Sequence, residues 1–176
     1  MSSDPGPAGL APLIAAGELR SWADEQKAQG LTVVFTNGCY DLFHEGHAAS
    51  LRAARECGDR LLVGINSDVS VRALKGGGRP LLDEEARSDL LRSLRAVDAV
   101  TIFSDPSVLP TILTVRPDIV AKGGQYDTAE IVGSREVEQW GGRVVRLPMV
   151  EGVSTTLLID RIRNLTPLAG EGKEDP

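Results

Sequence analysis

The chain has 176 residues, of which 41% are hydrophobic and 25% charged, and this composition excludes a fibrous or wholly disordered protein and favours one globular domain. A net charge of −6 argues against general binding to nucleic acid or to an anionic membrane. No apolar run approaches the roughly 20 residues that span a bilayer, no signal peptide is evident, and the two cysteines lack a disulfide framework, so we expect a cytoplasmic protein.

Apolar runs alternate with amphipathic patterns between two polar ends. Residues 1–12 and 167–176 are expected to be disordered tails, and residues 13–166 the folded domain. A helix is predicted over residues 17–29. Strands are predicted over residues 31–36, 60–66, 99–103, 119–121 and 143–147, and helices over residues 47–57, 68–74, 83–95, 107–115, 129–140 and 155–163.

This alternation of strands and helices predicts the fold class. Crossover connections make neighbouring strands parallel, so we expect an α/β, Rossmann-like doubly wound fold with a mainly parallel five-stranded sheet and helices on both faces. Ligands of such sheets bind beyond the carboxyl ends of the strands, where the strand order reverses. That rule selects the loops at residues 36–47, 67–79, 104–106, 122–126 and 149–154.

The first of these loops contains both histidines of the chain. His44 and His47 stand between an apolar strand pattern and a helix pattern, with Gly38 and Gly46 close by. The unpaired N–H groups and the dipole of a helix N-terminus attract anions, and an imidazole can donate a hydrogen bond to a phosphate oxygen. A histidine near a helix start is also often a cap or a packed surface residue. A zinc site is a weaker alternative, because neither Cys39 nor Cys57 belongs to a metal-binding spacing.

Three further loops carry cations or hydroxyls that suit phosphate. Lys75 and Arg79 flank three glycines, Lys122 ends a predicted strand, and Ser154 begins the last predicted helix. Taken one at a time, these are also typical of surface turns and of an ordinary helix cap. The parallel sheet is expected to bring them to one edge.

With these motifs assembled, the chain resembles the nucleotidyltransferase superfamily with the His-x-Gly-His signature. Within it the resemblance is closest to the adenylyltransferase domain of bacterial enzymes that convert heptose 1-phosphate to ADP-heptose. The resemblance spans residues 31–162 and rests on the motifs at residues 36–41, 44–47, 63–68, 74–76, 78–80, 97–98, 122–124 and 150–156.

The resemblance implies a role for each candidate residue. Catalysis is expected of His44, His47 and Lys122. Nucleotide binding is expected of Thr36, Asn37, Gly38, Cys39, Tyr40, Asp41, Gly46, Gly123, Glu151, Ser154 and Thr155. Substrate phosphate is expected to contact Lys75, Arg79, Arg87, Asn66 and Asp68, with a surface salt bridge as the alternative for Arg87. Magnesium is expected to arrive with ATP, without a dedicated protein metal site.

Two departures from the family pattern bear on substrate choice. Gln125 stands where an Asp is common, and Tyr40 stands where Phe is usual. The expected partners are ATP and a sugar 1-phosphate supplied by a separate sugar kinase, since no kinase domain fits in 176 residues, and a homodimer is compatible with the superfamily.

Three other functions share part of this pattern. A cytidylyltransferase acting on glycerol 3-phosphate shares the signature, but its branch usually has Arg-Thr where this chain has Met149 and Val150. A fragment of a class I aminoacyl-tRNA synthetase should bring a Lys-Met-Ser-Lys-Ser-like loop and a tRNA-binding domain. The sequence shows neither, which disfavours this alternative. A non-catalytic nucleotide-binding module is disfavoured by the intact histidines.

Overall fold

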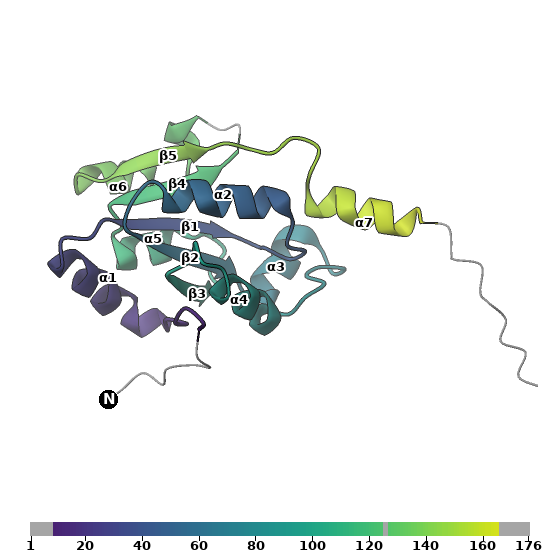
Figure 1. Cartoon of the computed structure of the whole chain (residues 1–176), viewed down its shortest axis with the longest axis horizontal. Coiled ribbons are helices and arrows are strands. Elements are labelled where there is room, and N and C mark those ends of the chain that lie inside the picture. Colours follow the sequence, from purple (N-terminus) through teal and green to yellow (C-terminus); the bar gives the residue numbers. More distant parts are fainter. Residues whose placement is uncertain (1–8, 125–126, 166–176) are drawn as a thin grey trace, which may run out of the picture.

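The strands of the protein form one parallel sheet. The computed structural model describes residues 9–124 and 127–165 (Figure 1). The strands are β1 (Val33–Gly38), β2 (Arg60–Asn66), β3 (Ala99–Phe103), β4 (Ile119–Gly123) and β5 (Arg143–Leu147). They lie in the order β3-β2-β1-β4-β5, and every neighbouring pair is parallel. The predicted Rossmann-like α/β fold is therefore confirmed.

Helices cover both faces of this sheet. The α-helices are α1 (Leu19–Ala28), α2 (Glu45–Arg55), α3 (Asp68–Lys75), α4 (Glu84–Arg92), α5 (Leu109–Val115), α6 (Ser134–Gln139) and α7 (Thr155–Arg163), and the 3-10 helices are η1 (Ala16–Glu18) and η2 (Thr128–Glu130). None of the helices in the described ranges is long and apolar enough to cross a bilayer.

Alternation along the strands creates two separate cores. In β1, Val34 is buried with α2 and α4 on one face, while Val33 and Phe35 are buried with α1, α5 and α6 on the other. Successive side chains of a strand point to opposite faces, so an uninterrupted apolar run is what a sheet covered on both faces requires.

The strand order reverses beside β1. The chain runs outward from β1 through β2 to β3, and then returns to place β4 on the other side of β1. The carboxyl ends of β1 and β4 therefore flank the switch point, which is where open α/β sheets bind ligands.

The structure corrects one predicted helix and shows contacts in one predicted tail. The helix expected over residues 129–140 is divided into η2 and α6, because Gly133 has a φ of +87°, which a continuous helix cannot contain. Ala11 and Pro12, which fall in the expected N-terminal tail, form backbone hydrogen bonds of 2.9 and 3.0 Å to Arg92 and Val100. Residues 1–8 and 166–176, the greater part of the two expected tails, lie outside the described residues.

Candidate active site

The two histidines lie where the chain leaves β1 and enters α2. His44 is the N-cap of α2, and its Nδ1 accepts a hydrogen bond of 3.4 Å from the backbone N–H of His47. The imidazole rings stack with centroids 3.8 Å apart and an angle of 19° between their planes. A Cβ added to Gly46 would lie 3.0 Å from the His44 ring, so a glycine at this position lets the ring lie against the helix start.

Aromatic residues enclose the inner histidine. Tyr40 and Phe43 place their rings 5.1 and 5.7 Å from that of His47. Tyr40 is buried and has a φ of +48°, the left-handed region, and burial raises the pKa of its phenol. The wall around His47 is therefore apolar and uncharged.

This environment keeps both imidazoles neutral. Burial, together with the neighbouring His44, lowers the pKa of His47 to about 4, and burial also lowers the pKa of His44. The Nδ1 of His47 is buried and has no hydrogen-bond partner among the described residues. At neutral pH these rings offer ligands neutral N–H donors.

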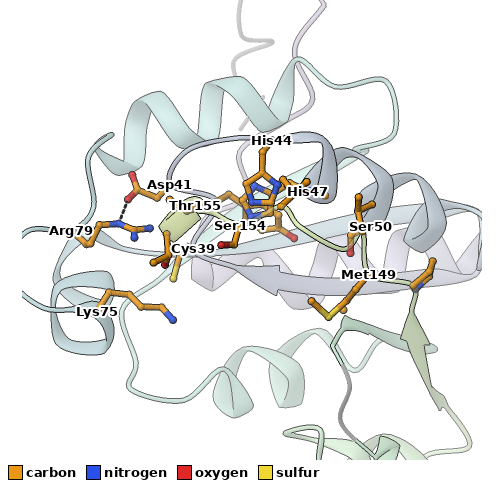
Figure 2. A pocket seen from close by; sticks show the side chains of 17 residues that line it. Cys39, Asp41, His44, His47, Ser50, Lys75, Arg79, Met149, Ser154 and Thr155 are labelled. Atoms are coloured by element: carbon orange, nitrogen blue, oxygen red, sulfur yellow. Dashed lines mark hydrogen bonds and ion pairs between the residues drawn. The ribbon is translucent and has the colours of Figure 1, made fainter. Parts of the chain in front are cut away.

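A first cavity of about 390 Å³ opens in front of the histidines (Figure 2). Two helix N-termini face it, those of α2 and α7. Ser154 caps α7 by accepting a hydrogen bond of 3.2 Å from the N–H of Leu157, and Thr155 Oγ1 donates to the carbonyl of Leu42 at 3.5 Å. Paired helix N-termini are a site for anions, and a polyphosphate is an anion long enough to contact both.

Two cations complete the first cavity. Lys75, the last residue of α3, and Arg79, just beyond the glycines, both line it. Figure 2 shows the two side chains on the same side of the cavity, with Arg79 joined to Asp41 by an ion pair. Lys75 and Arg79 outweigh the charge of Asp41, so this cavity is locally positive and suits a phosphate ligand, although the whole chain has a net charge of −6.

A second cavity, of about 570 Å³, lies beside the first. Lys122 at the end of β4 lines it and donates hydrogen bonds of 2.8 and 2.9 Å from Nζ to the backbone and side-chain oxygens of Asn37. Burial lowers the pKa of this ammonium to about 8. Cys39 and Lys75 line both cavities, so the two spaces meet at these side chains.

The comparisons with known proteins agree with this geometry. Residues 35–161 match the cytidylyltransferase-like family. The chain belongs to this family of nucleotidyltransferases. It is 47% identical over 144 residues to the bifunctional protein HldE of Syntrophotalea carbinolica, covering 82% of this chain and 29% of that protein. It is also 47% identical over 148 residues to the bifunctional protein HldE of Bradyrhizobium sp. strain ORS 278, covering 84% of this chain and 30% of that protein.

These relatives are much longer than the matched region. The chain spans about 30% of the length of the curated relatives that it matches. Among solved structures, a lipopolysaccharide core biosynthesis protein from Thermoplasma volcanium matches with a TM-score of 0.60 and 28% identity, over 69% of this chain and all of that one.

Within this nucleotidyltransferase fold, the predicted site residues divide into three groups. The first cavity is lined by the predicted residues Cys39, Tyr40, Asp41, His44, Gly46, His47, Lys75, Arg79, Gly123, Ser154 and Thr155. The second is lined by the predicted residues Asn37, Gly38, Cys39, Asn66, Lys75 and Lys122. Thr36, Asp68, Arg87 and Glu151 line neither.

Arg87 has a different environment from the one expected. It is 1% exposed and lines neither cavity, and its guanidinium forms an ion pair with Asp68, so the salt-bridge alternative holds with the arginine buried rather than at the surface. Its guanidinium donates to the carbonyls of Leu82 and Cys39 at 3.0 and 2.6 Å and to Asp68 Oδ1 at 2.7 Å. All three of its nitrogens are thus bonded to the protein itself.

Several lining residues are not among the predicted site residues, although Met149 and Val150 fall in the loop selected at residues 149–154. Pro148, Met149 and Val150 form one wall of the first cavity, and Ser50 lies on α2 one turn beyond His47. Ser50 could have been found from its spacing, because positions i and i+3 share a helix face. Val108 and Val132 line the second cavity as ordinary apolar residues, which carry no chemical signal in a sequence.

Proposed function

We propose that the protein transfers AMP from ATP to a heptose 1-phosphate, giving ADP-heptose and pyrophosphate. The observation that carries this proposal is the pair of cavities that meet at Cys39 and Lys75, one rich in phosphate-binding groups and the other containing Lys122. A donor nucleotide in the first and a sugar phosphate in the second would bring the two reacting groups together at this junction. The 47% identity to proteins named HldE supports the choice of a heptose.

The chemistry follows from the charge state of the groups. A sugar phosphate is anionic at neutral pH, so its oxygen attacks the α-phosphorus of ATP without a general base, and pyrophosphate leaves on the opposite side. Catalysis is then alignment and stabilisation of charge. The neutral imidazoles of His44 and His47 donate hydrogen bonds to the α-phosphate oxygens, on which charge accumulates. Ser154 and Thr155, with the N-terminus of α7, hold the β- and γ-phosphates.

Magnesium is best treated as part of the nucleotide substrate. The described residues contain no group of three or more His, Cys, Asp or Glu side chains that could hold a metal ion. Asp41, a carboxylate that lines the first cavity, is already hydrogen-bonded to Arg79 and to backbone N–H groups. Mg²⁺ prefers phosphate oxygens and water with few protein ligands, so MgATP fits a cavity of this kind.

The acceptor implies a supplying reaction. A heptose 1-phosphate is made by a kinase that phosphorylates the sugar, on this or another polypeptide, and ATP is the phosphoryl donor for such a step. We therefore place the reaction in the cytoplasm, with a sugar kinase as its functional partner.

Pyrophosphate release tests the proposal directly. The purified protein is assayed with magnesium and each of ATP, CTP, GTP and UTP, against both anomers of heptose 1-phosphate and against glycerol 3-phosphate. We expect release with ATP and one heptose anomer, and its loss in His47→Ala. Release only with CTP and glycerol 3-phosphate would replace the proposal with a cytidylyltransferase, and nucleotide binding without turnover would replace it with a binding module.

A further inference from the structure

Asp41 lines the first cavity, but its carboxylate is enclosed by hydrogen-bond donors of the protein itself. Its side chain is 0% exposed. Its Oδ1 accepts backbone N–H groups of Leu81 and Leu82 at 2.7 and 3.0 Å, and its Oδ2 accepts Nε of Arg79. A carboxylate facing a triphosphate would also repel it. Asp41 must therefore act through the groups that are hydrogen-bonded to it, which are Arg79 and the backbone N–H groups of Leu81 and Leu82.

Arg79 is the group that connects Asp41 to the cavity. Its side chain is 16% exposed, and only its Nε is hydrogen-bonded within the described part of the chain. Once Nε is fixed, the planar guanidinium can point its two terminal nitrogens in one direction only. Figure 2 shows them directed toward the other lining side chains. A guanidinium held in this way is suited to two parallel hydrogen bonds with phosphate.

On its N-terminal side, the segment around Arg79 is held by a backbone hydrogen bond of 3.1 Å from the N–H of Arg79 to the carbonyl of Gly76, which does not fix the side chain. α3 ends at Gly76, with a φ of +93°, and a Cβ built on Gly76, Gly77 or Gly78 would meet nothing within 4 Å. On its C-terminal side, Leu82 is attached to Arg87, which also holds the carbonyl of Cys39. Asp41 is thus the contact that sets the direction of the Arg79 side chain.

We propose that Asp41 is a positioning residue that aims the guanidinium of Arg79 at the β- and γ-phosphates of the nucleotide and at the pyrophosphate that leaves. The proposal rests on nucleotidyl transfer, the reaction of the family, and not on the identity of the base or the sugar. It assigns to Asp41 a task different from the nucleotide contact that the sequence suggested.

Asp41→Asn separates this task from a merely structural one. Asparagine retains an oxygen for the N–H groups of Leu81 and Leu82, but replaces Oδ2 by an NH₂ group that cannot accept from Arg79. The probe is magnesium pyrophosphate, titrated calorimetrically into the wild type, D41N, R79A and the double variant. Because pyrophosphate lacks base and sugar, its binding is independent of the substrate proposed above.

We expect D41N and R79A each to weaken pyrophosphate binding about tenfold to a hundredfold, the size of effect that a small misplacement produces. The double variant should bind within about twofold of R79A, because Asp41 acts only through Arg79. The matched control is Asp59→Asn, which removes one carboxylate charge from the opposite end of the sheet, where Asp59 accepts from the N–H of Thr32. Its affinity should equal that of the wild type.

Two results would overturn the proposal. One is wild-type affinity in D41N; the other is a double variant whose loss is the product of the two single losses. If D41N does not fold, pyrophosphate binding by R79K tests the proposal instead. The ammonium of a lysine is a compact charge without the planar fork of a guanidinium, so it cannot both pair with Asp41 and reach the phosphate. R79K should therefore bind as poorly as R79A, and wild-type affinity in R79K would contradict the positioning role.

Discussion

The stacked imidazoles of His44 and His47 are uncharged at neutral pH, because burial lowers the pKa of both rings. Two protonated rings 3.8 Å apart would repel each other, and Tyr40 and Phe43 offer no counter-charge. In the function proposed above, a bound triphosphate would supply that counter-charge and favour protonation of both rings.

We expect His47→Ala to lower kcat about a hundredfold to a thousandfold, the usual loss of one positioned donor to a transition state. The loss is measured as pyrophosphate release under saturating substrates. Thermal unfolding monitored by circular dichroism should show a folded protein. His47→Gln, which restores an N–H donor, should recover part of the rate, and an unchanged kcat in His47→Ala would remove His47 from the mechanism.

We expect Lys122 to set an alkaline limit on the proposed reaction. Its pKa of about 8 means that the ammonium is present below pH 8 and is lost as the pH rises through that value in the free enzyme. Since kcat/KM reports the free enzyme, kcat/KM for the sugar phosphate should decline above about pH 8. The comparison is Lys122→Arg, whose guanidinium stays charged. The decline of kcat/KM above about pH 8 should be absent in Lys122→Arg. The same decline in both proteins would show that a group other than Lys122 titrates.

At the level of elements, two short helices point their N-termini into one cavity. α2 begins after His44 and α7 begins after Ser154, and each cap closes its own helix start with a side-chain hydrogen bond. The helix dipoles and the free N–H groups therefore add at the same place, although α2 and α7 are more than a hundred residues apart. A single ligand that contacts both would connect two helices that are far apart in the sequence.

Substitutions of Ser154 separate capping from phosphate binding. Ser154→Asp keeps a good N-cap but places a negative charge beside the β- and γ-phosphates, whereas Ser154→Asn keeps the cap without the charge. We expect the KM for the nucleotide to rise at least tenfold in S154D, because every 1.4 kcal/mol of lost binding is a factor of ten, and to change much less in S154N. Steady-state kinetics at fixed acceptor measures both. Equal KM values would place Ser154 away from the phosphates.

The elements could be predicted from the sequence because their signals are local. The β-branched runs predict the strands, and Gly133 is the local signal that divides the helix predicted over residues 129–140 into η2 and α6. The contacts of Asp41 and Arg87 could not be predicted, since they join loops 38 to 48 residues apart through atoms that no spacing reveals. The motif loops were correctly grouped at one edge of the sheet, but which side chains face the cavities was decided by the tertiary structure.

On the scale of the whole molecule, α7 is set apart from the rest of the fold. Figure 1 shows it beyond the end of the sheet, joined to β5 by an extended connection. None of its residues is buried, and Leu157 and Ile162 are exposed. Helices held by so few apolar contacts open at low free-energy cost.

Hydrogen exchange should therefore find α7 poorly protected in the free protein and protected in the nucleotide complex. The amides of residues 155–163 are compared with those of β1, which is buried at the centre of the sheet and serves as the internal control. With nucleotide at about 100 times its Kd, binding stabilises the site by about 2.7 kcal/mol, which corresponds to roughly a hundredfold slowing. Equal exchange in the two states would show that α7 does not touch the nucleotide.

The junction at Cys39 and Lys75 has a consequence for inhibitor design. A compound that carries a nucleotide-like part for the first cavity and a sugar-like part for the second would need only a short covalent bridge past these two side chains. Linking two weak binders in this way makes the second binding event intramolecular and raises overall affinity far above that of either part. A mild electrophile placed on that bridge would lie beside the thiol of Cys39, and a bisubstrate inhibitor of this design could then be anchored covalently.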